Sequence, residues 1–326
     1  MTNYGWIQER RLAIIDLLLE SSEVDVNAHD IYGISPLHIA AHDEYLSESV
    51  FQKLIDKGAN ISLSTADKET SLHFAIADRN DVVISKLVPL GADPAFKDVT
   101  GHNALLYAAR KIQLSILQDI LTWTPKHSLQ TVLESKDNYG QNILHHLLGS
   151  RGHVNVELTA YLVEQASGIN DLDKGGLTPV AVFLSKFAPC AHEADTKVLD
   201  YLFEHGADPT STTVEGLGLV SLAARFLRLS VGLFQSLAKG GSSLTCQDSQ
   251  GRTALHHSAE SGTLTKKVLR YRQEVAKLPL NLHDGNGKTA LDYAIEKEQE
   301  VHGPNLFKPD RWLKTETLLR GIEEET

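Results

Sequence analysis

Apolar and small residues recur along the chain in short helical runs, each preceded by a polar turn. The best copy spans 248–259 and reads Asp-Ser-Gln-Gly-Arg-Thr-Ala-Leu-His-His-Ser-Ala. In this copy the Thr253 hydroxyl can cap a helix that buries Leu255. A second apolar run, such as 50–55 or 199–203, predicts an outer helix in the same unit. The alternating pattern of strands is absent, so the sequence predicts an all-α chain of helix pairs.

The turn of this unit aligns with seven others along the chain. The aligned turn residues, 33 to 40 residues apart, are Gly33, Lys68, Gly101, Gly140, Gly176, Gly216, Gly251 and Gly287. A period of this length is typical of solenoids, in which each unit buries its apolar face against its neighbours. We therefore expect one domain over 1–326, with repeats starting near 30, 65, 98, 137, 173, 213, 248 and 284. A partial unit over 1–29 precedes them, and a C-terminal loop and capping helix over 299–326 follow.

The repeat cores carry a specific motif. The first two read Ser-Pro-Leu-His-Ile-Ala at 35–40 and Thr-Ser-Leu-His-Phe-Ala at 70–75, and units end in Gly-Ala-Asn or Gly-Ala-Asp, as at 58–60 and 206–208. These motifs resemble the ankyrin repeat, whose signature Thr-Pro-Leu-His-x-Ala recurs about every 33 residues. The resemblance implies a solenoid of antiparallel helix pairs joined by hairpin-like loops, with loops and inner helices lining a concave face. It also implies that the fourth-place histidine of the core hydrogen-bonds the neighbouring loop; these histidines are His38, His73, His145 and His256.

The sequence departs from the repeat in several regions. Pro125 lies in a long tail of the third repeat, 123–136, which predicts an extra short helix. The fifth repeat inserts 187–195 between its helices, and the eighth has a Gly- and Pro-containing loop before a last helix over 312–320. Residues 10–20 match the outer helix of a preceding unit, so we expect the chain to be a piece of a longer array.

The composition and net charge limit the partners and the compartment that we expect for this chain. The 326 residues are 42% hydrophobic and carry a formal net charge of −11. A negative protein disfavours general binding to nucleic acid or anionic membranes, because both need a cationic face. No apolar stretch is long enough to span a membrane, and we see no targeting signal. Cys190 and Cys246 are too few for a disulfide framework, so we expect a reducing compartment, either cytoplasm or nucleus. We also expect the chain to be a monomer.

Residues suited to catalysis or metal binding form no recognisable motif. His38 and His42 lie on one helix face without a third ligand, and the histidine pairs at 145–146 and 256–257 point to different faces. There is no Gly-x-Ser-x-Gly elbow, and no glycine-rich loop follows a strand. The sequence therefore predicts no enzyme, no cofactor and no metal site.

The variable positions of the repeat point to a partner surface. In the ankyrin family these positions flank the turn Asp and follow the inner helix. Transferred to repeats three to five, they give positive side chains with no acidic residue among them: Lys97, Arg110, Lys111, Lys136, Lys174 and Lys186. His102 and Tyr139 occupy the same positions, and aromatic side chains are common interface anchors. We expect this group to bind an acidic or phosphorylated segment of a protein partner. The alternative is that the lysines only solvate an exposed face.

Two other classes of function stay open. In one, the chain is the regulatory or targeting part of a larger multidomain enzyme or signalling protein, which a longer reading frame would show. In the other, it is a pathogen effector built on the same scaffold, which secretion would show. The scaffold by itself does not name the partner, because unrelated proteins bind to the same fold.

Overall fold

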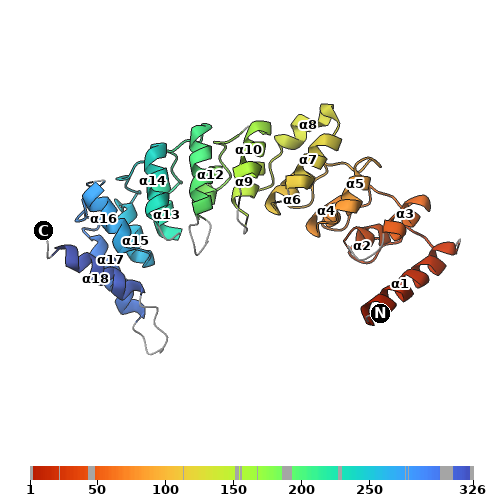
Figure 1. The fold of residues 1–326 in the computed structure, drawn as a ribbon, viewed down its shortest axis with the longest axis horizontal. Helices are drawn as coiled ribbons and strands as arrows, with labels where there is room; N and C mark the ends of the chain where they lie inside the picture. The colour runs from red at the N-terminus through yellow and green to blue at the C-terminus, as the bar shows by residue number, and fades with distance from the viewer. Residues whose placement is uncertain are drawn as a thin grey trace. The chain divides into compact units, whose positions relative to one another are not determined.

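The computed structural model describes residues 3–21, 23–42, 48–112, 114–150, 154, 156–166, 168–185, 193–226, 230–275, 277, 279–301 and 311–323. These residues fold into helices joined by turns and hairpin-like loops, which confirms the predicted all-α class (Figure 1). The helices are α1 (Asn3–Glu20), α2 (Pro36–His42), α3 (Glu48–Asp56), α4 (Ser71–Ala77), α5 (Asp81–Leu87), α6 (Ala104–Arg110), α7 (Leu114–Trp123), α8 (Lys126–Leu133), α9 (Ile143–Leu148), α10 (Val156–Gln165), α11 (Pro179–Ser185), α12 (Glu193–Glu204), α13 (Leu219–Phe226), α14 (Val231–Gly240), α15 (Ala254–Ser261), α16 (Lys266–Arg270), the π-helix η1 (Tyr271–Val275), α17 (Ala290–Val301) and α18 (Arg311–Glu323).

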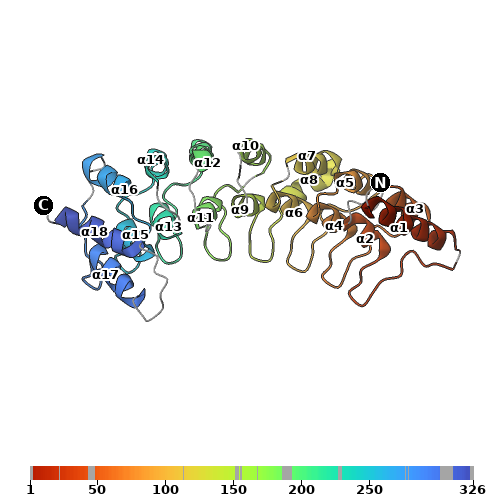
Figure 2. The same ribbon diagram turned by 60° about the horizontal axis from the view of Figure 1, so that its bottom comes forward.

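The helices pack in pairs within two compact units, Met1–His146 and Leu147–Thr326. In the first unit the inner helices α2, α4 and α6 pack side by side, and the outer helices α3, α5 and α7 form a second layer (Figure 2). In the second unit α11, α13, α15 and α17 form the inner layer, and α10, α12, α14 and α16 form the outer one. The predicted helix pairing is therefore present in both units. That residues 1–326 act as one domain stays a prediction.

Polar caps start the inner helices and connect each repeat to the next. Thr253 caps α15, and the His256 ring accepts the Thr253 backbone amide at 3.1 Å. The other ring nitrogen of His256 lies 3.1 Å from the carbonyl oxygen of Lys288 in the next turn. Thr70 and His73 repeat the arrangement in α4. The predicted role of the fourth-place histidine is confirmed at these positions, because it joins the cap of one repeat to the loop of its neighbour.

The aligned turns share one backbone conformation. All eight aligned positions have a positive φ, from 58° at Lys68 to 87° at Gly101. At Gly101 space also demands glycine, because a Cβ would lie 2.7 Å from the amide nitrogen of Asn138. Three residues before the turn glycine, one oxygen of Asp137 accepts the amides two and four residues on, both at 2.8 Å. The same pair of bonds forms at Asp30, Asp98, Asp173, Asp248 and Asp284.

The departures from the repeat are partly described. The extra helix predicted in the third repeat is α8, which follows Pro125. The N-terminal partial unit contains the helix α1, which packs against α3. Most of the insertion at 187–195, including Cys190, and the loop at 302–310 lie outside the described residues. None of the helices described is long and apolar enough to cross a lipid bilayer.

Candidate functional site

Adjacent hairpin loops of the first unit are joined edge to edge by backbone hydrogen bonds. The amide of Ala66 donates to the carbonyl oxygen of Tyr32 at 2.8 Å, and the amide of Asn138 donates to that of Thr100 at 2.9 Å. Figure 2 shows these loops next to one another on the same side of α2, α4 and α6. The loop tips therefore form a row from which side chains of several repeats can contact one partner.

The tips of this row carry large apolar side chains in solvent. Ile31 is 90% exposed, Tyr32 62%, Val99 46% and Tyr139 64%. Single exposed apolar residues are ordinary, but several at equivalent loop tips are typical of a protein interaction site. Tyr139, which the sequence selected as an anchor, is among them.

Four of the predicted basic residues are exposed on the first unit, at the tips or at the end of α6: Lys97, Arg110, Lys111 and Lys136. The ammonium group of Lys97 donates to the backbone carbonyl of Lys136 at 2.8 Å, so it lies across two neighbouring hairpins. Within the described residues, Lys97, Arg110 and Lys111 form no ion pair with a carboxylate. We call the following side chains the first-unit hairpin surface: Ile31, Tyr32, Lys97, Val99, Arg110, Lys111, Lys136 and Tyr139.

The remaining predicted residues are not part of this surface. Lys174 is exposed but belongs to the second unit. Lys186 lies outside the described residues. The structure therefore brings together four of the six predicted positive side chains on one unit.

Two basic residues of the second unit, Arg225 and Lys288, have acidic partners. Arg225 lies 3.2 Å from a Glu215 carboxylate oxygen, and Lys288 lies 2.7 Å from one of Glu296. Exposed pairs of this kind add little stability, but they neutralise the charge that a partner would meet. Lys97, Arg110 and Lys111 of the first unit therefore differ from Arg225 and Lys288 of the second unit, which have carboxylate partners.

His102 is a correction to the predicted surface, because it is buried. Only 8% of it is exposed, and its ring lies between Asp98 and Asp137. The Asp98 carboxylate accepts a hydrogen bond from the His102 amide at 2.8 Å, and this bond holds His102 in the buried part of the turn. Burial, and next the charge of His146, lowers the pKa of His102, although both carboxylates oppose this shift. An exposed contact with a partner is therefore not available to this side chain.

His102 belongs to a buried polar group in which three side chains converge. Asp137 Oδ2 lies 3.0 Å from His146 Nε2 and 3.5 Å from His102 Nε2, and the ligand atoms of the three residues lie within 4.8 Å of one another. Burial would raise the pKa of Asp137, but hydrogen bonds from His146 and the Gln141 amide hold it below its usual value. We call His102, Asp137 and His146 the Asp137 cluster. Two imidazoles and a carboxylate can hold a proton or a metal ion.

The sequence pattern does not predict that these three residues meet. His102 lies in the turn of one repeat, whereas Asp137 and His146 lie in the turn and inner helix of the next. A signal was nevertheless present, because at three turns the residue nine positions after the turn Asp is polar and points back at that carboxylate. It is histidine at 146 and 257 and tyrosine at 293, and each lies within 3.1 Å of its turn Asp.

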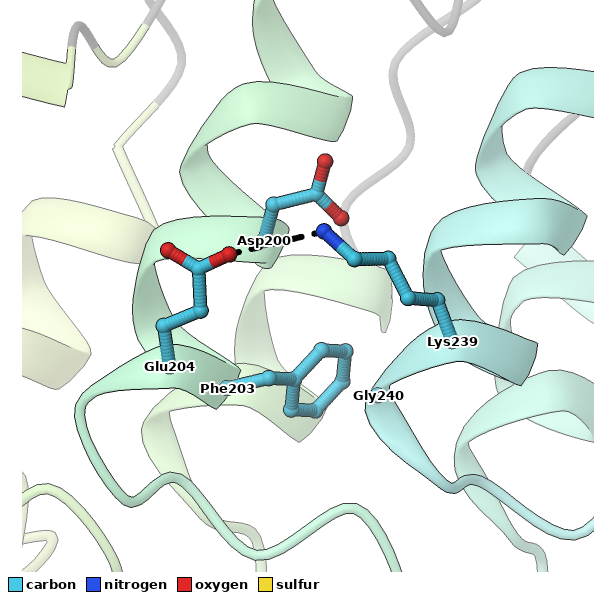
Figure 3. A pocket seen from close by; sticks show the side chains of 5 residues that line it. All are labelled: Asp200, Phe203, Glu204, Lys239 and Gly240. Atoms are coloured by element: carbon cyan, nitrogen blue, oxygen red, sulfur yellow. Dashed lines mark hydrogen bonds and ion pairs between the residues drawn. The ribbon is translucent and has the colours of Figure 1, made fainter.

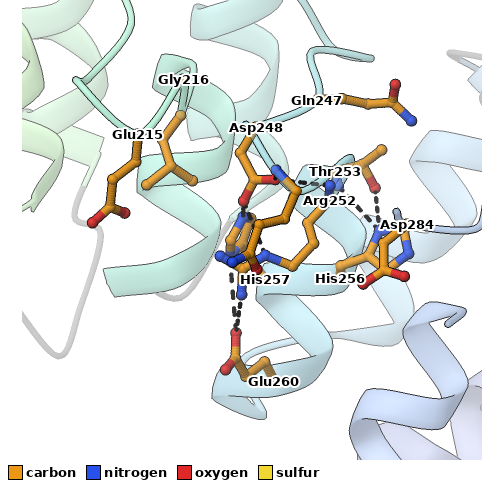
Figure 4. A network of polar contacts seen from close by, with 12 residues as sticks. Glu215, Gly216, Gln247, Asp248, Arg252, Thr253, His256, His257, Glu260 and Asp284 are labelled. Carbon is orange, nitrogen blue, oxygen red and sulfur yellow. Dashed lines mark hydrogen bonds and ion pairs between the residues drawn. The ribbon is translucent and has the colours of Figure 1, made fainter. Parts of the chain in front are cut away.

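The turn of Asp248 in the second unit has the same backbone arrangement, and here an arginine pairs with the carboxylate (Figure 4). Asp248 Oδ2 accepts Arg252 Nε at 2.9 Å and His257 Nε2 at 3.1 Å, and Arg252 also lies 3.4 Å from Glu260. The His257 side chain is fully buried. Burial, assisted by the positive charge of Arg252, lowers the pKa of His257 to about 4. The guanidinium of Arg252 neutralises this turn, so His257 stays uncharged at neutral pH.

A small hollow lies between the outer helices α12 and α14 (Figure 3). Its volume is about 150 Å³, and it is lined by Asp200, Phe203, Glu204, Lys239 and Gly240. Phe203 packs where Gly240 has no side chain, because a Cβ there would lie 2.3 Å from the ring. Lys239 and Glu204 pair at 3.4 Å across its mouth. The hollow results from helix packing and contains no group poised for chemistry.

Curated proteins with similar sequences match only in part. Palmitoyltransferase AKR1 of Lachancea kluyveri is 25% identical over 219 residues, which cover 66% of this chain and 28% of that protein. Human SH3 and multiple ankyrin repeat domains protein 2 is 36% identical over 104 residues, which cover 32% of this chain and 6% of that protein. The chain therefore spans less than a third of these curated relatives.

Solved structures and a family model agree on the fold. The human ASB11 ankyrin repeat domain has a TM-score of 0.58 at 22% identity, covering 76% of this chain and 99% of that one. The ankyrin repeat domain of Bcl-3 has a TM-score of 0.55 at 22% identity, covering 69% of this chain and 93% of that one. The family model "Ankyrin repeats (3 copies)" matches residues 37–128 and 220–302, more than half of the chain. This protein belongs to the ankyrin-repeat family.

Proposed function

We propose that the chain is a non-catalytic recognition module that binds a protein partner through the first-unit hairpin surface. The partner segment is acidic or phosphorylated. One observation carries the proposal: Lys97, Arg110 and Lys111 have no carboxylate partner within the described residues, whereas Arg225 and Lys288 of the second unit do. A negatively charged partner would form ion pairs with Lys97, Arg110 and Lys111. It would gain little from Arg225 and Lys288, which already have carboxylate partners.

Exposed apolar tips complete the proposed surface. Beside the basic residues, the surface offers a partner four large exposed side chains: Ile31, Tyr32, Val99 and Tyr139. Aromatic anchors among positive side chains match the composition of interfaces, where a few buried contacts carry most of the binding energy. The module is proposed to work as a monomer inside the cell.

The relatives favour a second candidate. AKR1 carries a transferase name and the E3 ubiquitin-protein ligase hecd-1 of Caenorhabditis elegans a ligase name, and the matches cover 28% and 4% of these proteins. The chain would then be the targeting or regulatory part of a longer protein. Full-length transcript sequencing tests this, because an open reading frame continuing beyond residues 1–326 into a catalytic domain would support it.

Selection of peptide ligands tests the proposed surface. The probe is a displayed library of random peptides that includes phosphoserine, panned on the full chain. Selected peptides should be rich in Asp, Glu or phosphoserine, and their affinity should fall as salt rises. Triple reversal at Lys97, Arg110 and Lys111 to Glu should weaken binding by more than about 10-fold, equivalent to about 1.4 kcal/mol.

A matched variant controls for net charge. Reversal of Arg225, Lys239 and Lys288 to Glu changes the net charge equally but lies in the second unit at paired residues. It should leave affinity within about 2-fold of wild type, equivalent to about 0.4 kcal/mol. Equal losses in both triple variants, or ligands without acidic residues, would contradict the proposed surface.

A further inference from the structure

The Asp137 cluster has the ligand types and spacing of a metal site. Two ligand atoms bound to one zinc ion at about 2.0–2.1 Å stand about 3.3 Å apart in a tetrahedron. In the Asp137 cluster the Asp137 carboxylate lies 3.0 Å from His146 Nε2 and 3.5 Å from His102 Nε2. All three ligand atoms lie within 4.8 Å of one another, so binding requires the imidazoles to close by at most about 1.5 Å.

The hydrogen bonds of Thr100 fix how His102 presents its ring. Thr100 Oγ1 lies 2.7 and 2.9 Å from the two oxygens of Asp98, and 2.6 Å from His102 Nδ1. A hydroxyl has one proton and an ionised carboxylate has none, so Thr100 donates to Asp98 and accepts from Nδ1. In the neutral ring the Nε2 atom then carries a lone pair, and this lone pair faces the Asp137 oxygen. A cation between these two acceptors, either a proton or a metal ion, would satisfy both of them.

The arrangement beyond the ligands is also that of a metal site. A histidine that binds metal through one nitrogen usually donates its other N–H to an oxygen that holds the ring in place. Thr100 and Asp98 perform this role for His102. Asp137 is held in turn by the amides of Tyr139 and Gln141, each at 2.8 Å.

Charge balance favours a cation at the same place. The side chains of Asp98 and Asp137 are 4% and 1% exposed. No Lys or Arg within the described residues pairs with either carboxylate, whereas the Asp248 turn has Arg252 for this purpose. Arg110 is close enough to act on His102, but it is exposed and forms no pair there. Buried carboxylates are stable when they are paired or bind a metal.

We propose that the Asp137 cluster binds one divalent transition-metal ion, zinc, through two imidazole nitrogens and one carboxylate oxygen. Imidazole and carboxylate ligands in a tetrahedral arrangement suit zinc, and water supplies the fourth ligand. The ion would connect the turn of His102 to α9 through His146. It would thereby fix the hairpins that carry Val99 and Tyr139. The proposed site does not rest on the proposed function, because none of its ligands belongs to the first-unit hairpin surface.

Metal titration of the full chain tests the site. The protein is stripped with a chelator and titrated with zinc chloride against a chromophoric competitor, then with cobalt chloride to follow the visible absorption of the bound ion. We expect one zinc per chain. His102→Gln and His146→Gln should each lower the affinity by more than about 100-fold, since loss of an outer partner already costs about 10- to 100-fold.

Two further variants keep the test decisive. His257→Gln is the matched control, because His257 is equally buried and contacts its turn Asp in the same way. It should leave zinc affinity unchanged. Gln141→Arg retains all three ligands but places a guanidinium where Arg252 stands in the other turn. It should abolish tight binding while the far-ultraviolet circular dichroism and the urea midpoint are retained.

The outcomes separate a metal site from a hydrogen-bonded cluster. Tight one-to-one binding that is lost in His102→Gln and in Gln141→Arg supports the proposal, even if His146→Gln fails to fold. Three results would overturn it: wild-type protein that binds zinc no better than Gln141→Arg, an equal loss in His257→Gln, or a cobalt spectrum that is unchanged in His102→Gln.

Discussion

The turns of Asp137 and Asp248 share a frame and differ in one residue. In both, the first carboxylate oxygen accepts two backbone amides, and the second contacts a histidine nine residues on. Four residues after the Asp stands Gln141 in one turn and Arg252 in the other. The guanidinium of Arg252 neutralises its turn, whereas the Asp137 carboxylate faces His102. The repeat thus fixes the backbone, and one variable side chain sets the electrostatics.

Replacing the turn aspartates should cause the largest loss of unfolding free energy, and the loss should differ between the two turns. Asp248→Ala leaves Arg252 and His257 without their carboxylate, which we expect to cost about 3–5 kcal/mol of unfolding free energy. Asp137→Ala leaves no guanidinium without its carboxylate and removes only the hydrogen-bond acceptor of His146, so we expect about 1–3 kcal/mol. Urea unfolding followed by circular dichroism measures both. Losses equal within about 0.5 kcal/mol, the usual scatter of independent sites, would contradict the distinction between the turns.

Acid should destabilise the Asp248 turn through His257. Its pKa is 6.5 in the unfolded chain and about 4 in the folded one. Between these values the unfolded chain binds a proton that the folded one does not, so stability falls as pH decreases from about 6.5 to about 4. The loss should reach about 3 kcal/mol.

Comparison of wild type with His257→Gln isolates this residue. Other buried histidines have lowered pKa values too, among them His38, His73, His102 and His256, so wild type keeps a slope from these groups. The variant should show a shallower fall in urea midpoint between pH 6.5 and pH 4. Parallel curves for the two proteins would rule out His257 as a source of the acid sensitivity.

Arg252→Gln gives the Asp248 turn the glutamine that the Asp137 turn has four residues after its Asp. We expect a loss of about 1.5–3 kcal/mol, because a charge-assisted hydrogen bond to a buried carboxylate disappears. The pKa of His257 should rise, since the charge of Arg252 contributes to lowering it. Nuclear magnetic resonance titration of the imidazole measures this rise, and an unchanged pKa would show that burial alone sets it.

Tyr139→Ala should have the smallest effect on stability and a clear effect on recognition. The side chain is 64% exposed, so the unfolding free energy should change by less than about 0.5 kcal/mol. Affinity for a selected peptide should fall by at least about 1 kcal/mol if Tyr139 anchors the partner. Val214→Ala is the control, because Val214 is an 83% exposed loop tip of the second unit. Equal affinity losses in both variants would place the binding site elsewhere.

Much of the fold followed from local rules. The helix starts at Thr70 and Thr253 and the left-handed turn at Gly101 were predictable, because capping and backbone sterics act over a few residues. The exposure of Lys97 and Tyr139 also followed from their place at the turn. The burial of His102 did not, because it depends on carboxylates from two repeats.

The sequence by itself determined the period, the helix pairs and the role of the fourth-place histidine, because these depend on contacts within a repeat or on a motif repeated in the next one. Only the tertiary structure decided which side chains meet across repeats. His102 lies 35 residues before Asp137 in the chain, yet its ring lies 3.5 Å from that carboxylate because stacking sets the register of neighbouring turns. The same stacking joins the hairpin tips into one row. Chemistry shared between repeats is therefore visible only once the repeats are packed.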